Sequence, residues 1–387
     1  MPRWIPKPTV RLKRLLLLPA IVVMQTCLGG VYAWSAMAPP LQASFGFSAG
    51  QTQLIFGLTI ATFTGVMVYA GRLLGTHGPR RLALLGGLLF GAGHLMAAAS
   101  QGRFLWLMAG FSLLGGTGIG LCYVSALTTG VQWFPRHKGL VTGVAVAGFG
   151  AGAVLLSALI TGLLAAGWTV LQVIGAIGWG YGVIICLAAI CLFQHNNSCA
   201  AAASDITIWR DPLFRGLATG MFCGTFAGLL IIGNLKPIGL DNGLSQATAT
   251  AAIGFFAVGN AIGRISWGWL ADRLGYASIV ISLLFLAVSL MLLTSISFTA
   301  GAFLVGLGFG ACFVVYATQV AAHYGPAHIA EIYPLIFLAY GAAGITGPTL
   351  GGLLYDLTQT YTWAITLGTA VALIGTWQTW RVRTNRG

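Results

Sequence analysis

One arginine lies inside an apolar stretch, in "GNAIGRISWGWLADR" at residues 259–273. Arg264 precedes Asp272 by eight residues, which is about 12 Å along a helix that rises ~1.5 Å per residue. If the Asp272–Arg273 pair marks the membrane surface, Arg264 lies near the middle of a hydrocarbon core about 30 Å thick. An arginine at that depth costs about 2.5–3.5 kcal/mol to insert, so we expect a compensating partner.

No acidic side chain of this sequence can supply that partner from within the membrane. All six Asp and Glu residues fall in predicted loops or at the ends of apolar runs. A planar guanidinium binds a carboxylate through two parallel hydrogen bonds, so we predict that Arg264 binds an anionic substrate. The alternative is a structural role, in which the side chain reaches the interface or donates hydrogen bonds to helix carbonyls.

Aromatic residues in the apolar runs are candidates to line the same site. A tyrosine offers an apolar ring and a hydroxyl that can donate to a carboxylate oxygen. Each of them could equally serve in packing or at the membrane interface. The candidates are Tyr32, Trp34, Tyr123, Tyr316, Tyr333 and Tyr340.

The elements that position these residues are predicted to be membrane-spanning helices. The chain has 387 residues, of which 57% are hydrophobic and 6% are charged, whereas soluble domains carry about 25% charged residues. Its apolar runs approach the ~20 residues that a helix needs to cross a bilayer. We count twelve such runs: 16–38, 51–71, 82–99, 104–132, 139–165, 170–193, 213–234, 247–270, 276–296, 299–322, 329–354 and 362–380.

The net charge of +13 reports membrane topology rather than nucleic-acid binding. If the N-terminus is cytoplasmic, sixteen of the 19 Lys and Arg residues fall on the cytoplasmic side, as the positive-inside rule requires. Arg103 and Lys236 are assigned to the outer side, Lys236 near the outer surface, and Arg264 lies within the membrane. The first apolar run is long and lacks a clear cleavage site, so we interpret it as a span rather than a signal peptide.

The sequence repeats weakly at an offset of about 197 and later 190 residues. Ser48 and Ser245 precede the second and eighth runs, and Pro40 and Pro237 are expected to end the first and seventh. "GTGIGLCY" at 116–123 matches "GLGFGACF" at 306–313. We therefore predict two halves, 1–193 and 212–387, joined by a cytoplasmic loop at 194–211. Parallel halves of this kind place the substrate between them near the midplane.

Several motifs resemble those of a known family. "GWLADRLG" at 268–275 resembles the inter-helix loop signature of the major facilitator superfamily, which marks Gly268, Asp272 and Arg273; Gly71 opens its degraded counterpart, "GRLLGTHGPRR". Three longer stretches, 30–48, 133–153 and 332–364, resemble the oxalate/formate antiporter family, a relative of the monocarboxylate transporters. The resemblance implies an all-α membrane protein with twelve transmembrane helices in two pseudo-symmetric halves.

The resemblance also bears on the site. The arginine that matches Arg264 is the anion-binding residue of the family. Where the oxalate-exchanging branch has a second cation on the eleventh span, this sequence has Tyr340. Where proton-coupled monocarboxylate transporters have an aspartate one turn before the arginine, this sequence has Asn260. We therefore expect a transporter for a monocarboxylate of lactate, pyruvate or formate size; the alternatives are a dicarboxylate exchanger and a proton symporter.

Two other classes of function fit the sequence less well. A ligand sensor would need a signalling domain or a long tail. A membrane enzyme would need a cluster of catalytic residues, but His94 stands alone within its predicted span. No nucleotide or metal motif is present, and we expect neither catalytic residues nor a cofactor. The expected partners are a small organic anion and membrane lipid, without nucleic acid, for a monomer in the cell (inner) membrane.

Overall fold

The structure is a computed structural model that describes residues 8–134, 138–193, 206–324 and 329–384. Within these ranges the chain forms helices and no strand. The helices of the first half are α1 (Pro8–Gly29), η1 (Gly30–Ala33), α2 (Trp34–Phe45), α3 (Ala49–His77), α4 (Pro79–Ala98), α5 (Phe104–Met108), the π-helical η2 (Ala109–Gly115), α6 (Gly116–Trp133), α7 (Lys138–Ala165) and α8 (Val170–Ile190). Those that follow are η3 (Ile206–Arg210), α9 (Pro212–Asp241), α10 (Gln246–Leu274), α11 (Ala277–Leu292), α12 (Phe298–Ala311), α13 (Val315–Tyr324), α14 (Ile329–Thr358) and α15 (Thr362–Thr384).

Ten helical stretches in the described ranges are long and apolar enough to cross a membrane. They coincide with ten of the twelve predicted runs. The run 276–296 forms α11, a shorter apolar helix, and the run 362–380 lies in α15, which is not among the ten. A membrane-spanning, all-helical protein is therefore confirmed, and the number twelve stays a prediction.

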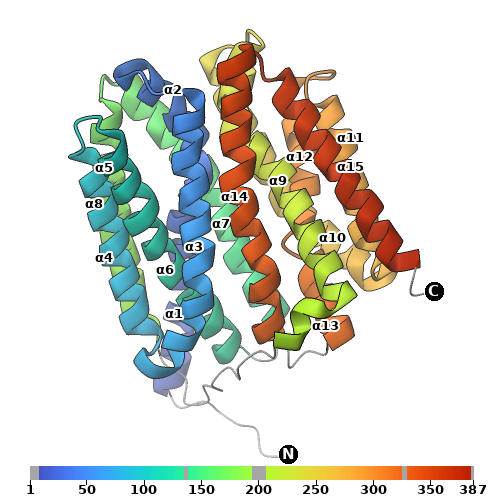
Figure 1. The fold of residues 1–387 in the computed structure, drawn as a ribbon. Helices are drawn as coiled ribbons and strands as arrows, with labels where there is room; N and C mark the ends of the chain where they lie inside the picture. The colour runs from blue at the N-terminus through green and yellow to red at the C-terminus, as the bar shows by residue number, and fades with distance from the viewer. Residues whose placement is uncertain (1–7, 135–137, 194–205, 325–328, 385–387) are drawn as a thin grey trace, which may run out of the picture.

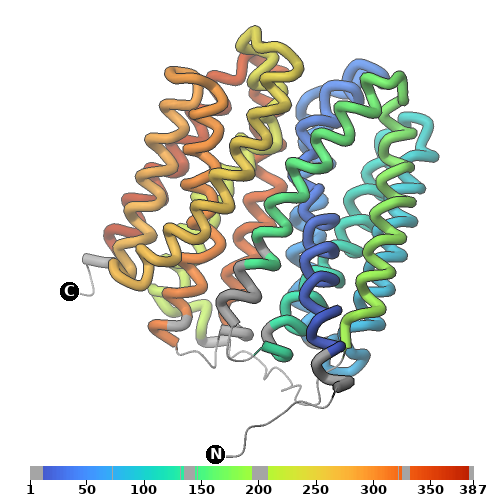
Figure 2. The backbone as a smooth tube through the Cα atoms, turned by 180° about the vertical axis from the view of Figure 1, so that it is seen from behind, coloured from blue at the N-terminus to red at the C-terminus, as the bar shows by residue number. Residues whose placement is uncertain are grey.

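The helices lie in two bundles, one formed by α1–α8 and the other by α9–α15 (Figure 1). The same two groups are seen from behind in Figure 2. The start of α1 and the end of α15 lie at one end of the bundles, here called the termini side; the opposite end, with the turns at 46–48, 242–244 and 359–361, is called the far side. The proposed boundary between the halves falls largely on residues 194–205, outside the described residues, so this division stays a prediction.

The internal repeat is visible in how helices begin and pack. Ser48 and Ser245 cap α3 and α10, each accepting a hydrogen bond from the backbone three residues on, as expected for an N-cap. Side chains added at Gly116 and Gly120 would meet the carbonyl oxygens of Thr59 and Phe63 on α3.

The matching glycines of the second half behave in the same way. Gly306 and Gly310 in α12 approach the carbonyl oxygens of Phe256 and Asn260 on α10, the positions 197 residues after Thr59 and Phe63. These glycines therefore serve close helix packing.

The prolines of the repeat do not end their helices. Pro40 lies inside α2, which continues to Phe45, and Pro237 lies inside α9, which continues to Asp241. The expectation that they end the first and seventh spans is wrong. A proline removes one backbone hydrogen bond, and packed membrane helices tolerate this loss.

Candidate functional site

Arg264 is hydrogen-bonded to a side chain of its own helix. Its Nε donates a hydrogen bond of 2.8 Å to Oδ1 of Asn260, one turn earlier in α10. Because α10 runs from the far side to the termini side, this bond directs the side chain along the helix towards the far side. The choice between an anion-binding role and a structural role for Arg264 stays a prediction.

The guanidinium keeps most of its binding capacity free. Arg264 is only partly buried, and its Cζ lies 4.3 Å from the ring centroid of Phe313, a favourable cation–π distance. Of the three guanidinium nitrogens of Arg264, only Nε donates a hydrogen bond to a residue that the structure describes. The four acidic side chains described, Asp211, Asp241, Asp272 and Asp356, form no pair with it. Both Nη groups are therefore available to an anion.

Four of the predicted tyrosines lie around this arginine. The hydroxyls of Tyr32 and Tyr340 form a hydrogen bond of 2.7 Å between the two bundles. Tyr340 packs edge-on against Phe313, with centroids 5.4 Å apart. Tyr333 donates a hydrogen bond of 3.2 Å to the Phe313 carbonyl. The charge of Arg264 interacts with the phenols of Tyr32, Tyr123, Tyr333 and Tyr340.

Trp34 and Tyr316 lie away from this cluster. Trp34 is fully buried at the start of α2 and packs on Phe111 at 4.8 Å, inside the first bundle. Tyr316 is buried in α13, where its hydroxyl faces Gly220 of α9, inside the second bundle. Among the described residues, no hydrogen bond, ring pair or cation–π contact joins either residue to Arg264, Phe313 or Tyr340.

Sequence reasoning missed the phenylalanines that join the tyrosines. Phe63 packs against Tyr123 at 5.4 Å and against Tyr340 at 6.3 Å. Phe149 packs against Tyr32 and Tyr123, both at 5.6 Å. The internal repeat held a signal for Phe313, because the match of "GTGIGLCY" with "GLGFGACF" aligns it with Tyr123.

The loop signature lies at the end of α10 on the termini side. Arg273 stacks on the ring of Trp269, with Cζ 3.9 Å from its centroid. Asp272 is exposed, and Gly268 approaches Val314. In the first half, Gly71 has open space where a side chain would be. The described residues place no hydrogen-bond or ion-pair partner on Asp272, so the role of this loop signature stays a prediction.

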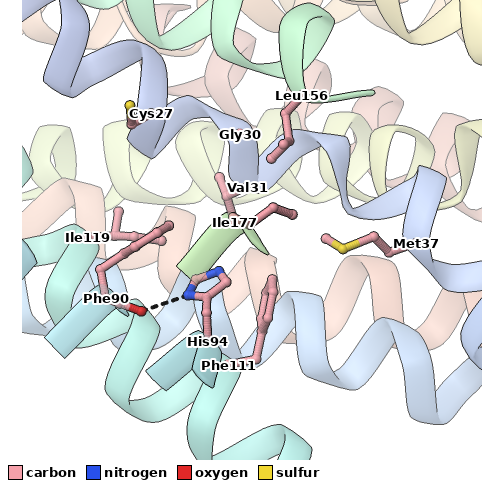
Figure 3. Close-up of a pocket in the computed structure, with 10 residues that line it drawn as sticks. All are labelled: Cys27, Gly30, Val31, Met37, Phe90, His94, Phe111, Ile119, Leu156 and Ile177. Atoms are coloured by element: carbon pink, nitrogen blue, oxygen red, sulfur yellow. Dashed lines mark hydrogen bonds between the residues drawn. The ribbon is translucent and has the colours of Figure 1, made fainter. Parts of the chain in front are cut away.

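A pocket in the first bundle surrounds His94 (Figure 3). The Nδ1 of His94 donates a hydrogen bond of 2.8 Å to the carbonyl oxygen of Phe90, and the ring lies 4.1 Å from Phe90 and 4.7 Å from Phe111. Figure 3 shows the imidazole among apolar side chains such as Ile119 and Ile177. His94 is thus a packed residue of the helix core. No group of three or more potential metal ligands occurs in the described part of the chain.

Comparison with known proteins agrees with this geometry. Residues 20–206 and 216–387 match the Major Facilitator Superfamily. The chain belongs to this superfamily.

Individual relatives of this superfamily are similar over most of their length. The chain is 28% identical to the uncharacterized MFS-type transporter YhjX of Escherichia coli (strain K12), with 86% of each chain covered. It is 26% identical to the oxalate:formate antiporter of Oxalobacter formigenes, covering 86% of this chain and 82% of the relative. It is 27% identical to human monocarboxylate transporter 11, covering 87% of this chain and 76% of the relative.

This major facilitator protein is therefore a transporter and not an enzyme. The relatives agree with the resemblance to the oxalate/formate antiporter family and the monocarboxylate transporters. As a member of the superfamily, it crosses the membrane several times and acts on a small molecule.

Proposed function

We propose that this chain carries a small monocarboxylate across the cell membrane by alternating access of its two bundles, with Arg264 as the anion-binding residue. The observation that carries the proposal is the free guanidinium. Its Nε is fixed by the neutral Asn260 at 2.8 Å, and no acid among the described residues offsets its charge. A carboxylate would supply both the charge and a bidentate acceptor.

The preference for a monoanion follows from the count of cations. A dianion in a low-dielectric site with one arginine keeps a net charge, whose desolvation costs several kcal/mol. Tyr340, rather than a basic residue, stands beside the site on α14, bonded to Tyr32. The names of the relatives, an oxalate:formate antiporter and a monocarboxylate transporter, fit small carboxylates as a class.

Exchange or uniport fits this site better than proton symport. A coupling proton needs a titrating group beside the substrate, and the position one turn before Arg264 is an amide, Asn260. The distribution of basic residues favours a cytoplasmic termini side and an outward-facing far side. We propose the inner membrane as the location.

Uptake of labelled lactate, pyruvate and formate by purified protein in vesicles tests this function. We expect Arg264→Ala and Arg264→Lys to lower uptake efficiency at least about 100-fold, since each charge-assisted hydrogen bond contributes about 1.5–3 kcal/mol and lysine lacks the planar fork. The matched control is Arg215→Ala, at an exposed arginine in the first turn of α9, which should transport normally. Near-normal uptake by Arg264→Ala would contradict the proposal.

Competition separates monoanions from dianions. Unlabelled monocarboxylates should displace labelled substrate at lower concentration than oxalate does. If oxalate competes best, the argument from a single cation is wrong, although the assignment of Arg264 stands.

A further inference from the structure

A second cation lies between the bundles without a partner. The sequence predicts that Lys236 lies near the outer surface, and in the structure it lies close to the far-side end of α9, with only 4% of its surface exposed. No hydrogen bond or ion pair joins its ammonium to any residue that the structure describes, although the ammonium, unlike the Gln53 amide, is not wholly shut off from solvent. Lysine is almost never buried unless it is paired, so a largely buried lysine side chain without a partner is unusual. This position therefore calls for an explanation.

Lys236 lies on the face of α9 that is directed at the first bundle. A side chain at Gly233 would lie 2.9 Å from Oε1 of Gln53 and 3.0 Å from Phe56, both on α3. Residues three apart share a helix face, so Lys236 lies on the same face as Gly233, one turn nearer the far side. Its burial thus arises at the contact between the bundles.

Gln53 is a second unsatisfied group at this contact. Its side chain is fully buried, and neither its Nε2 nor its Oε1 has a hydrogen-bond partner. Buried amides are nearly always hydrogen-bonded. An ammonium and an amide N–H that both lack acceptors fit a carboxylate.

The far-side contact that buries both groups is one that transport must open. Asp356 of α14 accepts hydrogen bonds from the backbone N–H groups of Ala49 (2.9 Å) and Gly50 (2.8 Å) at the start of α3. In alternating access, the bundles part on one side while they close on the other. Opening of the far side therefore exposes Lys236 and Gln53 to water.

The side chains of Lys236 and Arg264 tilt towards each other along the contact between the two bundles. Helix side chains tilt towards the N-terminus of their helix, and α9 and α10 run in opposite directions. Lys236 lies five residues before the last residue of α9, and Arg264 lies 18 after the first residue of α10. At ~1.5 Å per residue their Cα atoms are about 20 Å apart along the helix axes, so a small carboxylate meets them in sequence.

We propose that Lys236, assisted by Gln53, forms an outer binding station that captures the carboxylate when the far side is open, before it reaches Arg264. This inference rests on the proposed transport of monocarboxylates. The station acts on entry from the far side only, because closure of the bundles on that side buries it.

Transport in oriented vesicles tests the station. We expect Lys236→Met to raise the KM for uptake from the far side about tenfold, by loss of a steering and binding charge, with the maximal rate within about twofold. The KM for transport from the termini side should not change. Lys236→Arg should keep far-side KM within about threefold of that of the unmodified protein, because it retains the charge.

A chemical rescue keeps the test independent of folding defects. Lys236→Cys should show the same raised far-side KM, and reaction with a cationic aminoethyl thiosulfonate should lower it again, whereas a neutral reagent of equal size should not. The unmodified protein, treated in parallel, controls for its own cysteines. Equal effects of both reagents would overturn the station.

The two proposals fail in different ways. An unchanged far-side KM in Lys236→Met, together with loss of transport in Arg264→Ala, would overturn the station and leave the transport site intact. Normal transport by Arg264→Ala would instead overturn the proposed function.

Discussion

Asn260 sets the charge state of the site at the scale of single residues. Its Oδ1 fixes the guanidinium of Arg264 at 2.8 Å without neutralising it, and its side chain is buried, with 2% exposed. A carboxylate at the same position would hold the arginine equally well but would compete with the substrate for its charge. The amide therefore orients Arg264 and leaves its charge to the anion.

Replacement of this amide should make transport depend on pH. In Asn260→Asp, an ionised carboxylate pairs with Arg264, so uptake should fall about tenfold or more at neutral pH. Lowering the pH protonates the new carboxyl and releases the guanidinium, so uptake should recover as pH falls. Initial rates across a pH series measure this effect. Asn260→Ser, which adds no titrating group, should keep the pH profile of the unmodified protein; a matching acid recovery in that variant would contradict the argument.

The anion-binding residue could be predicted from the sequence better than the residues that line the site. A lone arginine in an apolar run is costly wherever it packs, so Arg264 stood out in the sequence. Which aromatic residue faces it depends on helix rotation and on contacts between distant segments, such as that between Tyr32 and Tyr340. Trp34 and Tyr316 have equally suitable side chains, but their faces turn into the separate bundles.

At the scale of elements, α3 and α14 form the closest helix pair between the bundles. A side chain at Gly57 of α3 would overlap the carbonyl oxygen of Gly344 in α14. Nearer the far side, a side chain at Gly352 would lie 2.5 Å from the Ala49 carbonyl oxygen. Backbone contact of this kind is what small residues permit between membrane helices.

An added methyl group should push α3 and α14 apart at Gly57 but not at Gly65. Gly57→Ala places a Cβ against the backbone of α14, so we expect a loss of about 1–3 kcal/mol in the stability of the far-side-closed state, as for overpacked cores. The matched control on the same helix is Gly65→Ala, where a Cβ meets nothing within 4 Å. Thermal unfolding and transport rates of both variants measure the difference; equal behaviour would show that the pair is not tightly packed in the membrane.

The helices themselves followed from hydropathy, but their interruptions did not. Apolar length predicts where a span lies, whereas the passage of α9 through Pro237 depends on neighbours that tolerate the lost hydrogen bond. The π-helical turn at Ala109–Gly115 is likewise set by packing, since the Ser112 hydroxyl donates a hydrogen bond of 2.7 Å to the Ile55 carbonyl on α3. No local sequence pattern carries that information.

At the scale of the whole molecule, the carboxylate of Asp356 joins the bundles on the far side. Asp356 accepts two backbone hydrogen bonds from the first turn of α3. A negative charge at a helix N-terminus stabilises by about 0.3–1 kcal/mol, and up to ~2 kcal/mol when it is partly buried. Asp356 belongs to the other bundle, so its contribution favours the state in which the far side is closed.

Loss of this charge should shift the balance between transport states. Asp356→Asn keeps one acceptor oxygen and removes the charge, so we expect the far side to open about 5–30-fold more often, equivalent to about 1–2 kcal/mol. A cysteine reporter, Gln53→Cys at a fully buried position, measures opening by its rate of reaction with an impermeant thiol reagent. The control is Asp241→Asn, because Asp241 accepts its hydrogen bond from Tyr361 within the same bundle. An equal labelling rate in both variants would contradict this role.

The hydrogen bond between Tyr32 and Tyr340 has a consequence for which acids complete a transport cycle. The two hydroxyls meet at 2.7 Å across the contact between the bundles, near the guanidinium of Arg264. An acid whose tail extends past the carboxylate by more than a few carbons would stand between them and hold the bundles apart. Such a molecule would bind Arg264 and stop the transport cycle. Acids of different chain length would then differ in their transport rate rather than in their affinity. The longer acids would act as inhibitors rather than as substrates.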